Sequence, residues 1–223
     1  MVNFLLYSNL WVLICALIGV VFSVRGLTKN GPLFFKMVCW AVICAFFARL
    51  FHFSVLMLFN EYDMNINMGT MGVFGSILFF LSANYGQIDG LVDDGSRKAI
   101  KARIIALIAP LLLIAIYGYY FMIYHELWPL SMLINVGIVV LIVLPCSYFS
   151  LKHLIIYDVE GGIVKSMRLF NLLAFIYELM VVAEWITMHM GYFDEYVGSL
   201  LVQGIVLLVI VPVAKMGVKK WTI

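Results

Sequence analysis

The chain has 223 residues, of which 65% are hydrophobic and only 12% are charged, and its net charge is +2. Its mean hydropathy is +1.09. A soluble domain carries roughly 45–50% apolar and 25% charged residues, so this composition excludes a soluble fold and predicts an integral membrane protein in contact with a lipid bilayer. The small net charge excludes a nucleic-acid partner.

Seven runs are apolar and close to the roughly 20 residues that a membrane-spanning helix needs. In lipid, every backbone amide must be satisfied within its own segment, so we expect all seven runs to be helices. The predicted fold is a single all-α domain, a bundle of seven transmembrane helices. The runs cover residues 3–24, 33–59, 69–88, 104–124, 130–151, 169–190 and 197–216.

Basic residues predict the orientation of the bundle, because Lys and Arg resist translocation across the membrane. They gather in the first, third and fifth loops and at the C-terminus, whereas the second, fourth and sixth loops carry acidic residues instead. We therefore predict an N-terminus outside and a C-terminus in the cytoplasm. The first run lacks the basic start of a cleaved signal peptide, so we expect it to be retained as a helix. The expected location is a cell membrane, the inner membrane of a bacterium.

The second run contains a basic residue, Arg49, well inside the span. It lies 16 positions after Leu33, or about 24 Å along a helix. His52 follows three positions later and shares the same face. The sequence has no metal-ligand spacing such as H-x-x-x-H and no C-x-x-C pair, so we predict neither a metal site nor a cofactor.

The sixth run carries a carboxylate at a matching height. Glu184 lies 16 positions after Arg168, which places it level with Arg49, and burying either charge alone costs about 2.5–3.5 kcal/mol. We therefore predict an ion pair between the second and sixth helices. Two interpretations remain open: a static clamp between helices, or a pair that grips a ligand from outside.

A second acid in the sixth run, Glu178, lies 10 positions after Arg168, or about 15 Å into the membrane. No basic residue is predicted at its level, which favours either proton coupling or a hydrogen bond across the bundle. Other polar residues fall in the outer halves of the fourth, fifth and seventh runs. Together these residues predict an outward-facing polar chamber that binds a small ligand, formed by Arg49, His52, Tyr117, Asn135, Glu178, Glu184 and Gln203.

Two runs open with related motifs, which indicates a possible internal repeat. Gly69-Thr70-x-x-Val73-x-Gly75 begins the third run, and Gly198-Ser199-x-x-Val202-x-Gly204 begins the seventh. Helices one to three and five to seven would then form two units joined by the fourth helix, a 3+1+3 plan used by transporters. Chance similarity between apolar helices is the alternative.

Three segments resemble a known family: residues 79–86 (FFLSANYG), 110–113 (PLLL) and 125–128 (HELW). They are similar to the seven-helix sensor domain at the N-terminus of many bacterial histidine kinases and diguanylate cyclases. The resemblance implies an outward-facing ligand chamber that relays a signal inward. That family normally continues into a catalytic output domain, whereas only six residues (218–223) follow here, so we expect signalling through a cytoplasmic or membrane protein partner.

These observations favour a membrane receptor or sensor subunit. The alternative is a small-solute transporter, similar in helix count and orientation to the SWEET and PQ-loop proteins, with Glu178 as the coupling acid; their Pro-Gln signature is missing from the first and fifth helices. A third possibility is a non-catalytic subunit of a larger membrane complex. No nucleophile and base share a recognisable spacing, so we do not expect an enzyme.

Overall fold

A computed structural model describes residues 2–27, 31–59, 66–90, 93–156 and 163–220. The described chain is helical and contains no strand, which confirms the predicted all-α class. Its seven membrane-length helices follow the seven predicted apolar runs. The elements are α1 (Val2–Leu27), α2 (Leu33–Phe59), α3 (Met68–Ala83), the π-helix η1 (Asn84–Asp89), α5 (Arg97–Ala106), α6 (Ile108–Tyr124), α7 (Leu130–Ile155), α8 (Ile163–Met190) and α9 (Phe193–Lys219).

Two of the apolar runs are interrupted in their helical geometry. The run at 104–124 begins in α5 and continues in α6, with a turn at Leu107 between them. Pro110 causes this break, because it has no N–H to donate to the carbonyl of Ala106 and its ring crowds that carbonyl. The run at 69–88 begins as α3 and ends in η1, where the turn widens to i→i+5 hydrogen bonds.

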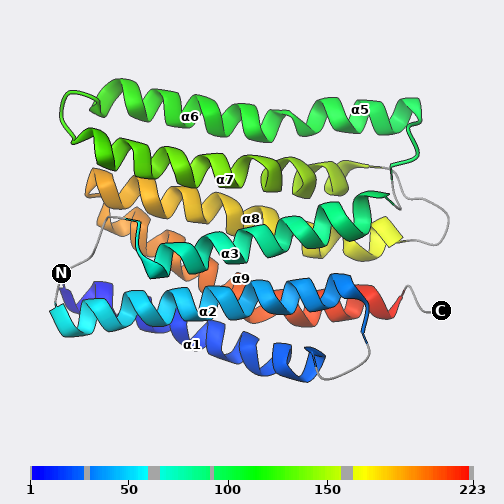
Figure 1. Ribbon diagram of the computed structural model, residues 1–223, viewed down its shortest axis with the longest axis horizontal. Helices are drawn as coiled ribbons and strands as arrows, with labels where there is room; N and C mark the ends of the chain where they lie inside the picture. The colour runs from blue at the N-terminus through cyan, green and yellow to red at the C-terminus, as the bar shows by residue number, and fades with distance from the viewer. Residues whose placement is uncertain (1, 28–30, 60–65, 91–92, 157–162, 221–223) are drawn as a thin grey trace.

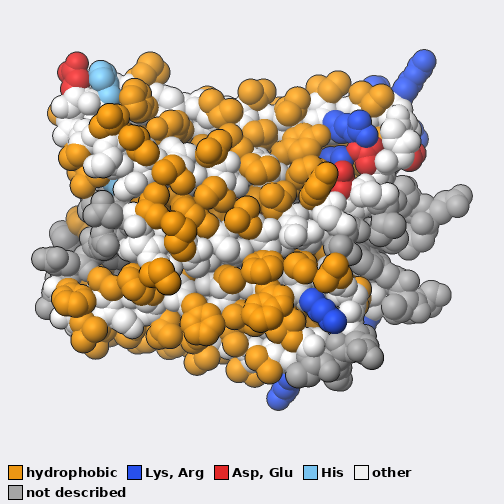
Figure 2. All heavy atoms as spheres, in the orientation of Figure 1, with side chains coloured by type: hydrophobic (Ala, Val, Ile, Leu, Met, Phe, Trp, Pro, Cys, Tyr) orange, Lys and Arg blue, Asp and Glu red, His pale blue; other side chains and the backbone are white. Residues whose placement is uncertain are grey.

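Helices α6 and α7 lie along one side of the bundle and α1 and α2 along the other, with α3 and α8 between them (Figure 1). Helices α1, α2 and α9 pack on one another, α2 packs on α3, and α8 packs on α9 and α7. Helix α6 lies at the far side of the bundle and packs mainly on α7. The surface of α6 that does not pack on α7 is broadly hydrophobic, as Figure 2 shows, and such a surface is suited to contact with lipid tails.

Small residues allow the closest helix approaches. A Cβ added to Gly19 of α1 would lie 2.6 Å from the backbone carbonyl oxygen of Leu207 on α9 and 2.8 Å from a methyl group of Val42 on α2. Only glycine fits there, since neither backbone can move without disturbing its own helix. This contact fixes the packing of α1 between α2 and α9.

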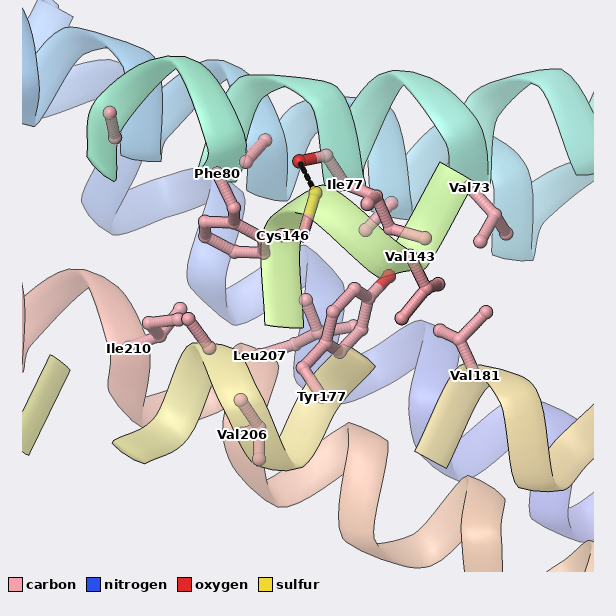
Figure 3. Packing of buried hydrophobic residues seen from close by; sticks show 14 of the residues in the cluster. Val73, Ile77, Phe80, Val143, Cys146, Tyr177, Val181, Val206, Leu207 and Ile210 are labelled. Atoms are coloured by element: carbon pink, nitrogen blue, oxygen red, sulfur yellow. Dashed lines mark hydrogen bonds between the residues drawn. The ribbon is translucent and has the colours of Figure 1, made fainter. Parts of the chain in front are cut away.

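The centre of the bundle is a layer of apolar side chains from α3, α7, α8 and α9 (Figure 3). Ile77, Val143 and Val181 are buried there, and Tyr177 lies among them. Cys146 of α7 is also fully buried. Its Sγ donates to the backbone oxygen of Ile77 at 3.5 Å, so this thiol behaves as a packed apolar group with a weak donor.

Charge is distributed unevenly along the bundle. Apart from Arg49, the Lys and Arg residues of the described chain gather at one end (Figure 2), where α1, α7 and α9 finish and α5 and α8 begin. We call this the basic end. It is the end that the sequence predicts to face the cytoplasm; the orientation and the 3+1+3 repeat both stay predictions.

Candidate functional site

Arg49 of α2 is bound by side chains from two other helices. Its Nη1 and Nη2 donate to Oε1 and Oε2 of Glu184 on α8, each at 2.6 Å. Nη2 also donates to Oε1 of Gln203 on α9 at 2.5 Å, and Gln203 Nε2 donates to Glu184 Oε2 at 2.9 Å. The predicted ion pair is thereby confirmed. We call Arg49, Glu184 and Gln203 the clasp.

The clasp is closed to solvent. Arg49 is 1%, Glu184 3% and Gln203 0% exposed, and the two charges meet in the bidentate geometry that makes arginine–carboxylate pairs strong. Gln203 Nε2 further donates to the backbone oxygen of Met180 at 3.1 Å. The clasp therefore joins α2, α8 and α9, and a ligand that reaches the guanidinium must first displace a carboxylate.

His52 lies one turn from Arg49 on α2 and is 8% exposed. Its imidazole packs against the start of α3, where a Cβ added to Gly69 would lie 2.3 Å from Nε2. The glycine of the motif that opens the third run therefore makes room for this ring. His52 adjoins the clasp because it lies three residues from Arg49 on the same face of α2, as the sequence predicts.

Glu178 lies apart from the clasp, six residues earlier on α8. It is fully buried, and its Oε1 accepts a hydrogen bond from Ser150 of α7 at 3.0 Å. Ser150 in turn accepts a bond from the amide of Asn84 in η1 at 3.2 Å. The other carboxyl oxygen of Glu178, Oε2, has no hydrogen-bond partner among the described residues, and neither do the two amide atoms of Asn171.

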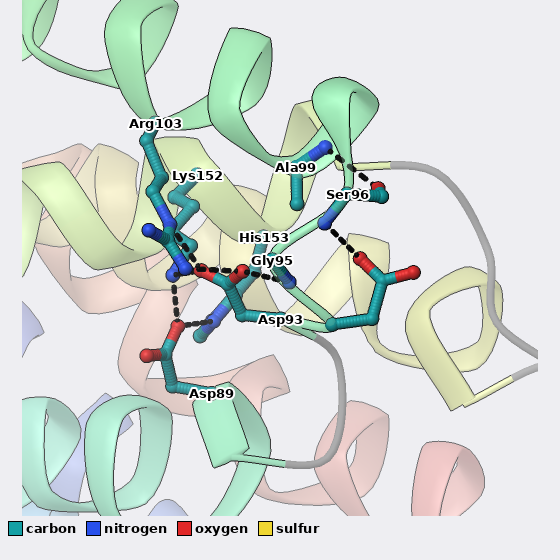
Figure 4. A network of polar contacts seen from close by, with 9 residues as sticks. Asp89, Asp93, Gly95, Ser96, Ala99, Arg103, Lys152 and His153 are labelled. Atoms are coloured by element: carbon teal, nitrogen blue, oxygen red, sulfur yellow. Dashed lines mark hydrogen bonds and ion pairs between the residues drawn. The ribbon is translucent and has the colours of Figure 1, made fainter.

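A cluster of charged side chains lies at the basic end, near Asn84 and Ser150 (Figure 4). Lys152 of α7 forms ion pairs with Asp89 and, at 2.5 Å, with Asp93. Arg103 of α5 forms a bidentate pair with Asp93, with both bonds at 2.6 Å. His153 Nε2 lies 3.1 Å from Asp89 Oδ1. These contacts tie η1, α5 and α7 together.

Two carboxylates of this cluster have lowered pKa values. The hydrogen bond from Arg103 holds the pKa of Asp93 well below its usual 3.8, a shift that burial opposes and Lys152 reinforces. Burial acts to raise the pKa of Asp89, but the hydrogen bonds from His153 and Lys152 outweigh it, so the pKa is lowered. Both groups are therefore carboxylates at neutral pH.

Sequence reasoning does not identify this cluster as a site. Lys152 and Arg103 count only among the basic residues that predict the orientation. The sequence predicts no role for Asp89, Asp93 or His153. The available signal is that Lys152 and His153 directly follow an apolar run, where a charge faces either solvent or a partner.

The remaining predicted chamber residues lie elsewhere. Tyr117 is half-buried on α6, and its hydroxyl donates to the backbone oxygen of Leu133 on α7 at 3.1 Å. Asn135, also half-buried, lies on α7. The structure thus brings together Arg49, Glu184 and Gln203, with His52 adjoining. Tyr117 instead bonds from α6 to α7, and Asn135 lies on α7.

A cavity of about 190 Å³ lies at the end opposite the basic end, between α1, α8 and α9. His189, a fully buried residue of α8, is among its mainly apolar lining residues. The Nδ1 of its imidazole lies 2.6 Å from the backbone oxygen of Trp185, so Nδ1 carries the proton. Nε2 has no hydrogen-bond partner within the part of the chain that the structure describes. The cavity is lined by Leu5, Trp128, Met188, His189, Met190, Gly191, Phe193 and Tyr196.

Comparison with family models, curated proteins and solved structures found no match for the chain. Within the described residues, no group of three or more His, Cys, Asp or Glu side chains is placed to hold a metal ion.

Proposed function

We propose that this multi-pass membrane protein is a small-solute transporter whose cycle is coupled to proton binding at Glu178. The observation that carries the proposal is a fully buried carboxyl group inside the bundle. A serine hydroxyl is its one recorded partner in the described chain, and no cation lies within ion-pair distance. A bare carboxylate in such a place is costly, and intramembrane acids of this kind mark proton relays in pumps and transporters.

Coupling follows from the two charge states of this group. With a proton bound, Glu178 is neutral and tolerates the apolar surroundings of α7 and α8. Without the proton, it requires water or a cation, which favours a conformation in which α7 and α8 separate. Proton binding therefore biases one of two arrangements, as a coupling site must.

The test is electrical and works with a solute of unknown identity. Proteoliposomes on a solid-supported membrane receive concentration jumps of the low-molecular-weight fraction of yeast extract, and the transient current is recorded at several pH values. We expect a pH-dependent current that Glu178→Gln abolishes. Glu195→Gln, which makes the same change at an exposed residue of α9, should retain it. A wild-type current no larger than that of Glu178→Gln overturns the proposal.

The cavity beside His189 favours a second candidate, a receptor subunit that binds a small, largely apolar ligand and signals through a protein partner. Binding of 1-aminoanthracene, a small fluorescent aromatic amine, tests this site, with Met188→Trp as the variant that fills the cavity. Saturable binding that this variant abolishes, in a protein that gives no transport current, would favour the receptor; absence of binding would exclude this candidate.

A further inference from the structure

A continuous series of contacts between polar side chains leads from Glu178 to the surface of the bundle. We propose that Asp89, His153, Asn84 and Ser150 form a proton-uptake path that leads from the basic end to Glu178. The inference rests on the proposed function, in which Glu178 binds the coupling proton, and adds the route by which that proton arrives.

The path begins where solvent can reach it. The side chain of Asp89 is 19% exposed, whereas that of His153 beside it is 1% exposed. Lys152 pairs with the same Asp89 oxygen, Oδ1, that His153 contacts, and Asp93 and Arg103 complete the charged surroundings (Figure 4). A carboxylate at the surface gathers protons, and an imidazole directly behind it can accept one and release it on its far side.

The π-helical turn explains how one short segment supplies two steps of the path. Asn84 and Asp89 are its first and last residues, five positions apart. In an α-helix, five positions correspond to a rotation of about 140° between side chains, which would direct them to different neighbours. The wider turn of η1 brings both side chains to His153, whose Nδ1 lies 3.5 Å from Asn84 Oδ1 and whose Nε2 lies 3.1 Å from Asp89 Oδ1.

The inner half of the path is set by helical spacing on α7. Ser150 and His153 are three residues apart, so they share one face of the helix. Asn84 donates its amide N–H to Ser150 Oγ at 3.2 Å, which leaves the serine hydroxyl proton directed at Glu178 Oε1, 3.0 Å away. Each hydrogen bond in this pair therefore points towards the carboxyl group.

The transfer balances as a shift of one proton. The proposed transfer adds one water molecule beside Asn84, because an amide does not itself relay a proton. Imidazolium at His153 would release its Nδ1 proton to that water, and the water would pass a proton to Ser150 Oγ. Ser150 gives its own hydroxyl proton to Glu178 Oε1. His153 ends neutral, Glu178 ends as the carboxylic acid, and Ser150 and the water are unchanged; Asn84 is a positioning residue that orients both neighbours.

The experiment follows Glu178 directly in the reconstituted full chain. After a rapid drop in pH, time-resolved infrared spectroscopy records the C=O stretch of the newly protonated buried carboxyl. Loss of this band in Glu178→Gln assigns it; if the band persists in that variant, the proposed function fails at its first step. With the band assigned, its rate of appearance tests the path separately.

We expect Ser150→Ala and His153→Gln each to slow the rise of the band at least about tenfold, since a positioned proton-transfer group is worth about 10²–10⁴ in rate. Ser147→Ala is the matched control, because Ser147 is equally buried on α7 but donates to the backbone oxygen of Leu144. Its rate should equal that of the wild type. If Ser150→Ala does not fold, His153→Gln decides alone. Rates within twofold of the wild type in the folded variants overturn the path.

Discussion

Replacing Glu184 with Gln should destabilise the protein more than replacing Arg49 with Gln. The asymmetry arises because a carboxyl group can neutralise itself by binding a proton, whereas a guanidinium group keeps its charge at every accessible pH. Glu184→Gln therefore leaves a cation in a site that is 1% exposed. Arg49→Gln leaves a carboxyl that still accepts a hydrogen bond from Gln203.

The size of the effect follows from the closure of the clasp. Removing one partner of a buried ion pair costs about 3–5 kcal/mol, and we expect Glu184→Gln to lie in that range. We expect about 1–3 kcal/mol for Arg49→Gln, the cost of a buried polar group that loses a partner. The double variant should cost less than the sum of the two, because it removes both charges and leaves amides that can bond to one another.

The assay is equilibrium unfolding in mixed detergent and SDS micelles, followed by the fluorescence of the five tryptophans. Glu195→Gln controls for the chemical change at an exposed site and should shift the free energy of unfolding by less than about 0.5 kcal/mol. An ordinary hydrogen bond between membrane helices is worth about 0.6 kcal/mol. The reasoning is refuted if Glu184→Gln costs no more than that, or if Arg49→Gln costs more than Glu184→Gln.

Three further predictions address packing, pH and orientation. Gly19→Ala should cost about 1–3 kcal/mol of unfolding free energy, because the added methyl group meets a backbone oxygen at 2.6 Å; Gly118→Ala, with open space at its Cβ, should cost nothing in the same assay. Asp93 has a lowered pKa in the folded protein, so its stabilising effect is present above pH 3.8 and is lost as the pH falls further; Asp93→Asn should flatten this acid-side decline in melting temperature. A membrane-impermeant maleimide should label Glu126→Cys in intact cells, but label Lys98→Cys only after permeabilisation, and the reverse result would invert the orientation.

Most of the fold could be predicted because lipid leaves the backbone few options. An apolar run of about 20 residues has to be a helix there, so hydropathy alone placed all seven spans. The interruptions were harder. The turn before Pro110 has a direct cause in the sequence, whereas η1 has none: nothing in the residues from Asn84 to Asp89 distinguishes a π-turn from the end of an α-helix, and packing against α7 accompanies the wider turn.

The two polar networks differed in predictability for an electrostatic reason. Arg49 and Glu184 are rare charges within apolar runs, and the free-energy cost of burying either charge in lipid predicts that each has a partner. Because the two residues lie at the same depth in the membrane, each is the expected partner of the other. Lys152 lies where an apolar run ends, and a charge at that position can be solvated by water as readily as it can be stabilised by an ion pair. Its partner Asp89 lies on a different helix at the same end of the bundle, and only the tertiary structure selects this pair among the many charges there.

The positions of the networks also limit how Glu178 can communicate with the two sides of the membrane. Glu178 and Glu184 are six residues apart on α8, or about 9 Å, and buried apolar side chains such as Val143 and Val181 lie in the packed layer of the core there (Figure 3). The polar links recorded for Glu178 in the described chain run through Ser150 towards the basic end. In the proposed cycle, a proton that leaves Glu178 for the opposite side would have to cross this apolar layer. If Glu178 exchanges protons with both sides as proposed, the separation of α7 and α8 would also move α8 relative to α2 and α9, and we expect this movement to open the ion pair of Arg49 and Glu184.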